Sequence, residues 1–210
     1  FPSPPRVREF IVRMSDPRHR YLPLSVRAVA PHAGWLGLHG ESSPPDRPAD
    51  SLPLFSSPGR PLGGGLAVVR ADLWDALSHQ PAAWAVLEVS AATPGGSVTA
   101  RGLANTDGRV VVVLPYPEMA PPPAPTSPPP SRIGLSAQSW EVTLTVRYAG
   151  LTGTETEPPD LGDILGQATG TLLDQSSPAT PLAGATLLYG QELILRSSDD
   201  GRGRVLVHRA

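Results

Sequence analysis

Alternation of apolar and polar residues dominates this chain and predicts short β-strands. Residues 139–150 alternate over five apolar positions, as expected for a strand buried on one face. Residues 24–30 alternate in the same way, and residues 109–115 hold four consecutive valines, which is typical of a strand covered on both faces. The other strands expected on this basis span residues 7–14, 66–74, 82–92, 97–104, 185–197 and 204–210.

One segment near the C-terminus carries a helical pattern instead. Leu161, Ile164 and Leu165 have the spacing of one helix face, and Asp160 precedes them as a candidate N-cap. Two glycines within the segment weaken the pattern. We therefore expect one short helix of about two turns over about 159–168.

Short strands and turn signals together predict an all-β fold. Asp107–Gly108, between two strand patterns, is a strong hairpin signal. The chain of 210 residues has 27 prolines and 21 glycines, which argues against long helices. We expect an antiparallel, Ig-like sandwich over residues 1–116, a proline-rich linker over 117–132, and a small C-terminal β-rich extension with the short helix over 133–210.

The proline-rich segment has two interpretations. Eight prolines fall within residues 116–134, and a polyproline II conformation would let them span roughly 40 Å. The segment is either a stiff linker between two parts of one chain or an arm laid across a neighbouring subunit. In the second case the arm would deliver the C-terminal strands to the sheet of that neighbour. Both pairings of the C-terminal strands, with the same sandwich or with that of a neighbour, stay open.

Charge and composition exclude several classes of function. The formal net charge of −2 provides no field that would attract nucleic acid or an anionic membrane. Cysteine is absent, so neither a disulfide nor a thiolate metal site can form. The sequence contains no apolar run long enough to span a membrane, and its first residues lack the apolar core of a signal peptide. We expect a cytoplasmic protein.

Candidate catalytic and metal-binding residues are sparse. His32 and His39 share a Gly/Pro-rich loop with Glu41, but none of the five histidines has the i, i+4 spacing of a helical metal site. Asp199 and Asp200 lie in an expected turn, where aspartate is favoured for local hydrogen bonding. We expect a protein that is not an enzyme and that holds no cofactor and no metal.

Interaction residues are the better candidates for function. Trp35, between a glycine and a leucine in the 31–65 loop region, is a candidate for an exposed contact, whereas Trp84 and Trp140 fall in strand patterns typical of a core. An exposed Trp35 would suit a carbohydrate- or surface-binding module. The candidate interaction residues are Trp35, Tyr116, Pro121, Pro122, Pro123, Pro128, Pro129, Pro130 and Tyr189.

Two family resemblances add to these expectations. The stretch WAVLEVSAATPGGSVTARGLANTDGRVVVVLPYPE resembles the end of a carboxypeptidase-regulatory or transthyretin-like β-sandwich. Such domains have an alternating strand, a TDxxGR turn and a strand ending in proline. Here the turn is Thr106 to Arg109, one residue shorter because Asp107 and Gly108 are adjacent. The resemblance implies a transthyretin-like sandwich within residues 1–118.

The second resemblance covers more of the chain. Five motifs occur along the chain in the order DPRHRYLPLSVRAVAP, LPLFSSPGRPLGGGLAVVRADLWD, RGLANTDGRVVVVLPYPE, PPDLGDILGQ and ATLLYGQELILRS. The arrangement resembles accessory proteins of phage-tail-like contractile injection systems. It implies a non-enzymatic structural or adaptor subunit in the baseplate, cap or exterior of a particle. The implied partners are tube, sheath, baseplate or cap proteins in a symmetric assembly.

Overall fold

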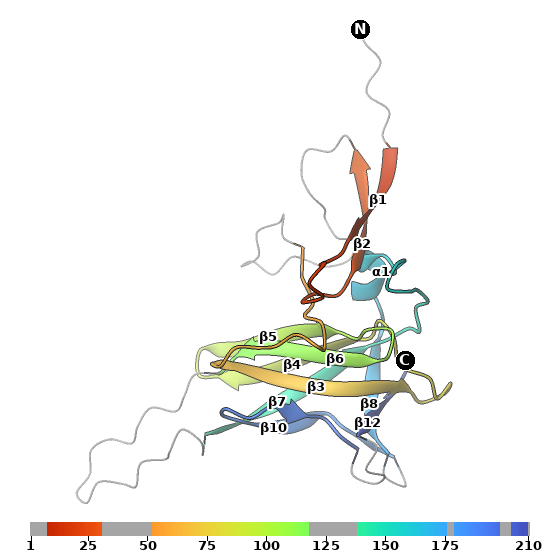
Figure 1. Cartoon of the computed structure of the whole chain (residues 1–210). Helices are drawn as coiled ribbons and strands as arrows, with labels where there is room; N and C mark the ends of the chain where they lie inside the picture. Colours follow the sequence, from red (N-terminus) through yellow and green to blue (C-terminus); the bar gives the residue numbers. More distant parts are fainter. Residues whose placement is uncertain (1–7, 31–51, 118–137, 176–178, 198–202, 210) are drawn as a thin grey trace, which may run out of the picture.

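The computed structural model describes residues 8–30, 52–117, 138–175, 179–197 and 203–209 (Figure 1). They form short strands and one helix, α1 (Leu161–Leu165), which confirms the predicted all-β, sandwich-like fold. The strands are β1 (Arg8–Met14), β2 (Leu24–Ala30), β3 (Leu66–Asp75), β4 (Val86–Thr93), β5 (Gly96–Leu103), β6 (Arg109–Pro115), β7 (Ser139–Arg147), β8 (Thr169–Asp174), β9 (Thr180–Pro181), β10 (Gly184–Leu188), β11 (Leu193–Ile194) and β12 (Arg204–His208).

A curled sheet forms the body of the molecule. Its strands follow the order β6–β3–β12–β8–β7–β4–β5, and the two end strands lie against each other. A Cβ atom on Gly102 of β5 would lie 2.4 Å from the carbonyl oxygen of Val111 in β6, so only glycine allows this approach. The sheet encloses a core of valine, leucine and alanine side chains. It is mixed rather than purely antiparallel, because β11 and β12 run parallel to β3.

The turn at Asp107–Gly108 is present, but it does not close the predicted hairpin. The side-chain oxygen of Asn105 accepts the N–H groups of Asp107 and Arg109, which folds the chain sharply. On either side of the turn, β5 pairs with β4 and β6 pairs with β3. The turn therefore carries the chain from β5 to β6, the two end strands of the curled sheet, which lie against each other.

The C-terminal strands complete the sheet of their own chain. β7 pairs with β4, and β12 fits between β3 and β8. The described strands of the expected extension over 133–210 are therefore part of the same sheet as β3, β4, β5 and β6. Its details also differ from prediction. β8 was not predicted, and the single strand expected over 185–197 is divided into β10 and β11 by a turn that includes Gly190, whose φ is 73°.

A smaller second core joins the body to the β1–β2 hairpin. Leu24 and Val26 of β2 pack there with Leu161 and Ile164 of α1 and with Trp84. The predicted N-cap is confirmed, although the five-residue helix is shorter than expected. Asp160 Oδ1 accepts the Gly162 N–H at 2.8 Å, and Asp160 Oδ2 accepts the Arg27 N–H at 2.7 Å, so the cap also ties α1 to β2. Figure 1 shows the hairpin projecting beyond the body.

Candidate functional site

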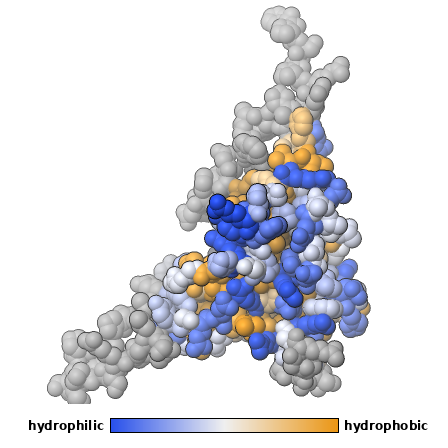
Figure 2. Space-filling model, in the orientation of Figure 1, coloured by the Kyte–Doolittle hydropathy of each residue, from blue (hydrophilic) through white to orange (hydrophobic). Residues whose placement is uncertain are grey.

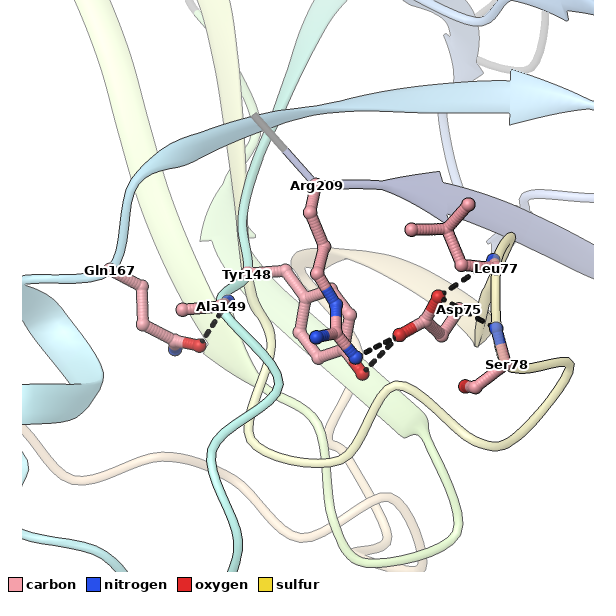
Figure 3. Close-up of polar contacts among 7 residues, drawn as sticks. All are labelled: Asp75, Leu77, Ser78, Tyr148, Ala149, Gln167 and Arg209. Carbon is pink, nitrogen blue, oxygen red and sulfur yellow. Dashed lines mark hydrogen bonds and ion pairs between the residues drawn. The ribbon is translucent and has the colours of Figure 1, made fainter.

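A buried ionic cluster lies where three distant segments meet (Figure 3). Asp75, the last residue of β3, is fully buried. Its Oδ1 accepts the Leu77 and Ser78 N–H groups at 2.8 and 3.2 Å. Its Oδ2 accepts the Tyr148 hydroxyl at 3.2 Å and a hydrogen bond from Arg209 Nη2. The Arg209 guanidinium also lies over the Tyr148 ring, 5.1 Å from its centroid.

These contacts fix the charge states of the cluster. Burial alone would raise the pKa of Asp75, but the Leu77 N–H, the Arg209 guanidinium and the Ser78 N–H outweigh it and lower the pKa to about 2. Burial, together with the Asp75 charge, raises the pKa of Tyr148. The hydrogen bond to Asp75 raises the pKa of Arg209. At neutral pH the cluster is thus a carboxylate, a guanidinium and a protonated phenol.

This arrangement suits structural stabilisation rather than proton transfer. A carboxylate with a pKa of about 2 is a weak base at neutral pH, and both oxygens of Asp75 already accept hydrogen bonds. The ion pair instead links the end of β3 to the residue that follows β12. We therefore interpret the cluster as a clamp on the C-terminal strand.

A buried glutamine continues the polar network toward the second core. Gln167 Oε1 accepts the Ala149 N–H at 2.8 Å, as Figure 3 shows. Its Nε2 donates to the carbonyl oxygens of Trp84 at 2.8 Å and Ile164 at 3.0 Å. One side chain therefore satisfies three backbone groups from three segments, which fixes α1 against the body.

Two of the predicted interaction residues meet in an aromatic cluster. Tyr116 lies between Trp140 and Tyr189, with ring centroids 5.5 and 4.7 Å apart, and its hydroxyl oxygen accepts the Gly190 N–H at 2.8 Å. All three rings are half-buried. Tyr116 is next to the start of the proline-rich segment, and Trp140 follows its end. The cluster therefore brings Tyr116, which precedes the proline-rich segment, close to Trp140, which lies beyond it.

The other predicted interaction residues lie outside the described residues. They are Trp35, Pro121, Pro122, Pro123, Pro128, Pro129 and Pro130. His32, His39 and Glu41, the residues considered for a metal, lie outside them too. Among the residues that the structure does describe, no three histidine, aspartate or glutamate side chains gather as a metal site would require.

The sequence analysis missed the exposed apolar end of the β1–β2 hairpin. Phe10 and Ile11 are 48% and 65% exposed, although they sit in the middle of a strand. Figure 2 shows apolar surface at this end of the molecule. A usable signal was present, because Phe10, Ile11 and Val12 are consecutive. A strand with apolar residues on both faces needs cover on both.

Comparisons with other proteins leave this geometry as the main guide to function. No family model, curated protein or solved structure matched the chain. Within the described ranges, no helix has the length and apolar character needed to cross a membrane. The features available for functional argument are thus the ionic clamp, the aromatic cluster and the exposed hairpin.

Proposed function

We propose that this protein is a non-enzymatic structural or adaptor subunit of a phage-tail-like contractile injection particle. The choice of this kind of particle is supported by the order of the five sequence motifs that resemble accessory proteins of contractile injection systems. Tube, sheath, baseplate or cap proteins are its proposed partners, and its proposed place of assembly is the cytoplasm. It acts by contacts between subunits rather than by turnover of a substrate.

The observation that carries this proposal is the projecting hairpin. The apolar face that begins in the second core with Met14 and Leu24 continues outward to Phe10, which is about half exposed. Exposed apolar surface that extends from a core is typical of a protein–protein contact. The clamped body gives such a hairpin a rigid base, as an assembly subunit requires.

The direct test is whether the protein is part of an intact particle. Particles sedimented from the native host would be purified and analysed by mass spectrometry for this chain beside the sheath and tube proteins. We expect co-sedimentation at a fixed ratio to sheath, lost when the sheath gene is deleted. Recovery of complete particles without this protein, while it remains in the soluble fraction, would refute the proposal.

Carbohydrate or surface binding is a second candidate, favoured by the aromatic cluster. Tyr116, Trp140 and Tyr189 present partly exposed rings, and aromatic faces are common contacts for sugars. A glycan array probed with the full chain would test it. Binding lost in Trp140→Ala, with unchanged thermal unfolding, would favour this candidate, and an array without signal would remove it.

A further inference from the structure

The outer edge of β1 is a free strand edge in the described part of the chain. β1 pairs with β2 and with no other described strand. β2 is covered on its far side, where Ser25 bridges to Asp160 and the Arg27 N–H donates to Asp160 Oδ2. Edge strands are usually protected by charged side chains, by proline, by bulges or by short length, because they pair readily with other chains. β1 has seven residues without proline or a bulge, and its charged residues include both signs, so they can pair with opposite charges on a second strand.

The hydrogen-bond pattern shows which backbone groups this edge presents. The Arg27 N–H points away from β1, toward Asp160. Arg27 lies opposite Ile11, so this pair is not hydrogen-bonded within the hairpin. In an antiparallel ladder, the N–H and C=O of Ile11 must then point away from β2. The same alternation directs the backbone groups of Glu9 and Arg13 to the free edge.

The side chains along this edge form a self-complementary pattern. If β1 meets a second β1 antiparallel with Ile11 opposite Ile11, then Glu9 lies opposite Arg13 of the second copy, and Arg13 lies opposite its Glu9. Phe10 then lies opposite Val12 on the other face. Opposite charges and apolar pairs facing each other stabilise an antiparallel ladder. Both ion pairs are satisfied at once only in this two-fold register.

We propose that β1 pairs antiparallel with β1 of a second copy of this chain, centred on Ile11. The result is an isologous contact in which two hairpins form one four-stranded sheet. Three residues of each copy, Glu9, Ile11 and Arg13, supply the backbone hydrogen bonds. The proposal is independent of the particle assignment, since it rests only on the edge, the register and the charges of β1.

Glu9 and Arg13 already form ion pairs within the chain, but these pairs are weak enough to be exchanged for contacts with a second copy. Glu9 contacts Arg27 at 3.5 Å and Arg13 contacts Glu157 at 3.3 Å, with more than half of each side chain exposed. Exposed pairs of this kind contribute little to stability, so they offer little resistance to new partners. Pairing would also place the two Ile11 side chains next to each other at the centre of the contact, which removes part of their surface from water.

Charge reversal tests the register. Full-length protein would be examined by sedimentation over about a hundredfold range of concentration, across which a weak dimer dissociates. Wild type is expected to reach twice the mass of one chain. Glu9→Arg and Arg13→Glu are each expected to remain monomeric, because like charges then face each other. An equimolar mixture of the two variants is expected to recover the dimer, since every facing pair is opposite again.

Leu54→Lys is the matched control, because Leu54 is 58% exposed but lies outside β1. It should leave the dimer intact, whereas Ile11→Lys should abolish it. A wild type that stays monomeric throughout, single variants that still dimerise, or a mixture that fails to recover would each overturn the proposal.

A cross-link provides a second test that does not depend on charged variants. The chain has no cysteine, so Ile11→Cys introduces a single thiol. Opposed Cα atoms in a hydrogen-bonded pair are about 5.5 Å apart, within the range that a disulfide can join. Arg13→Cys is the control, because its two copies would be displaced by about 14 Å along the strands. Oxidation should cross-link Ile11→Cys far more than Arg13→Cys, and equal yields would refute the register.

Discussion

Replacing Arg209 by methionine would remove the cation that faces the buried carboxylate of Asp75. Asp75 contributes stability because its pKa falls from an ordinary 3.8 to about 2 on folding, which corresponds to about 2 kcal/mol. Removing one partner of a buried pair costs about 3–5 kcal/mol, because the other charge is left uncompensated. The Arg209 side chain is 39% exposed, so water replaces part of its effect. We expect a loss of about 2–3 kcal/mol in the free energy of unfolding at pH 7.

The pH dependence has a definite sign. The stability from a carboxylate with a depressed pKa is fully present above its unfolded value of 3.8 and is lost as the pH falls toward about 2. The difference between wild type and Arg209→Met should therefore be largest at neutral pH and shrink as the pH falls below about 4. A double variant, Asp75→Asn with Arg209→Met, should lose less of the free energy of unfolding at pH 7 than Arg209→Met alone, because no buried charge remains at this site.

Urea unfolding followed by tryptophan fluorescence, repeated from pH 7 downward, would measure these differences. Arg109→Met is the matched control, because Arg109 contacts Asp72 at 4.0 Å with both side chains about half exposed or more. Arg109→Met should lower the free energy of unfolding by less than about 1 kcal/mol. A loss in Arg209→Met no larger than in this control, or one that does not change with pH, would refute the ionic clamp.

Three further substitutions test the packing and the polar network. Gly102→Ala should lower the free energy of unfolding by several kcal/mol or prevent folding, because its Cβ atom would clash with the Val111 carbonyl. Gly95→Ala is the control, because a Cβ atom there meets open space, and it should change stability by less than about 0.5 kcal/mol. Urea unfolding midpoints would compare the two variants. Gln167→Ala leaves three backbone groups without their partner and should cost about 3 kcal/mol, and retention of the wild-type midpoint would contradict its role. Asp160→Ala removes a helix cap and a bond to β2 and should cost about 2 kcal/mol, with Asp160→Asn losing less in the same assay.

Local patterns predicted the strands whose character is decided locally. The predicted spans 24–30 and 109–115 coincide with β2 and β6. Each carries a strong apolar signal ended by proline or polar residues. The N-cap at Asp160 was also predictable, because capping depends on a few consecutive residues.

Elements that depend on distant partners were not predictable in the same way. Residues 169–174 have two adjacent leucines among threonines and glycine, with no clear period, and they become β8 only because β7 and β12 pair with them. The strand expected from residue 82 begins at Val86 as β4, because Trp84 takes a φ of 62° and places its ring in the second core. The burial of Trp84 was predicted correctly from its hydrophobic character, but the backbone conformation of Trp84 was not predicted.

The candidate sites show the same limit. Asp75, Tyr148 and Arg209 come from three distant segments, and no spacing in the sequence connects them. Tyr116 and Tyr189 were predicted as contact residues, but their meeting with Trp140 follows from the fold. The sequence left open whether the C-terminal strands pair with the sheet of their own chain or with that of a neighbour, and the structure shows pairing within the chain. The parallel pairing of β12 with β3 is set by tertiary contacts.

The contrast between the body and the hairpin argues that function lies at the hairpin. In the body, the buried carboxylate of Asp75 is neutralised and hydrogen-bonded by residues of other segments. In the hairpin, the ion pairs are exposed and contribute little, and Phe10 and Ile11 face water, which favours neither folding nor solubility. Since the exposed apolar residues of the hairpin do not stabilise the fold, we infer that they contact a partner. A second copy of the chain, paired antiparallel along the edge of β1 that no described strand covers, places Glu9 opposite Arg13 and Phe10 opposite Val12, so it satisfies backbone, charged and apolar groups together.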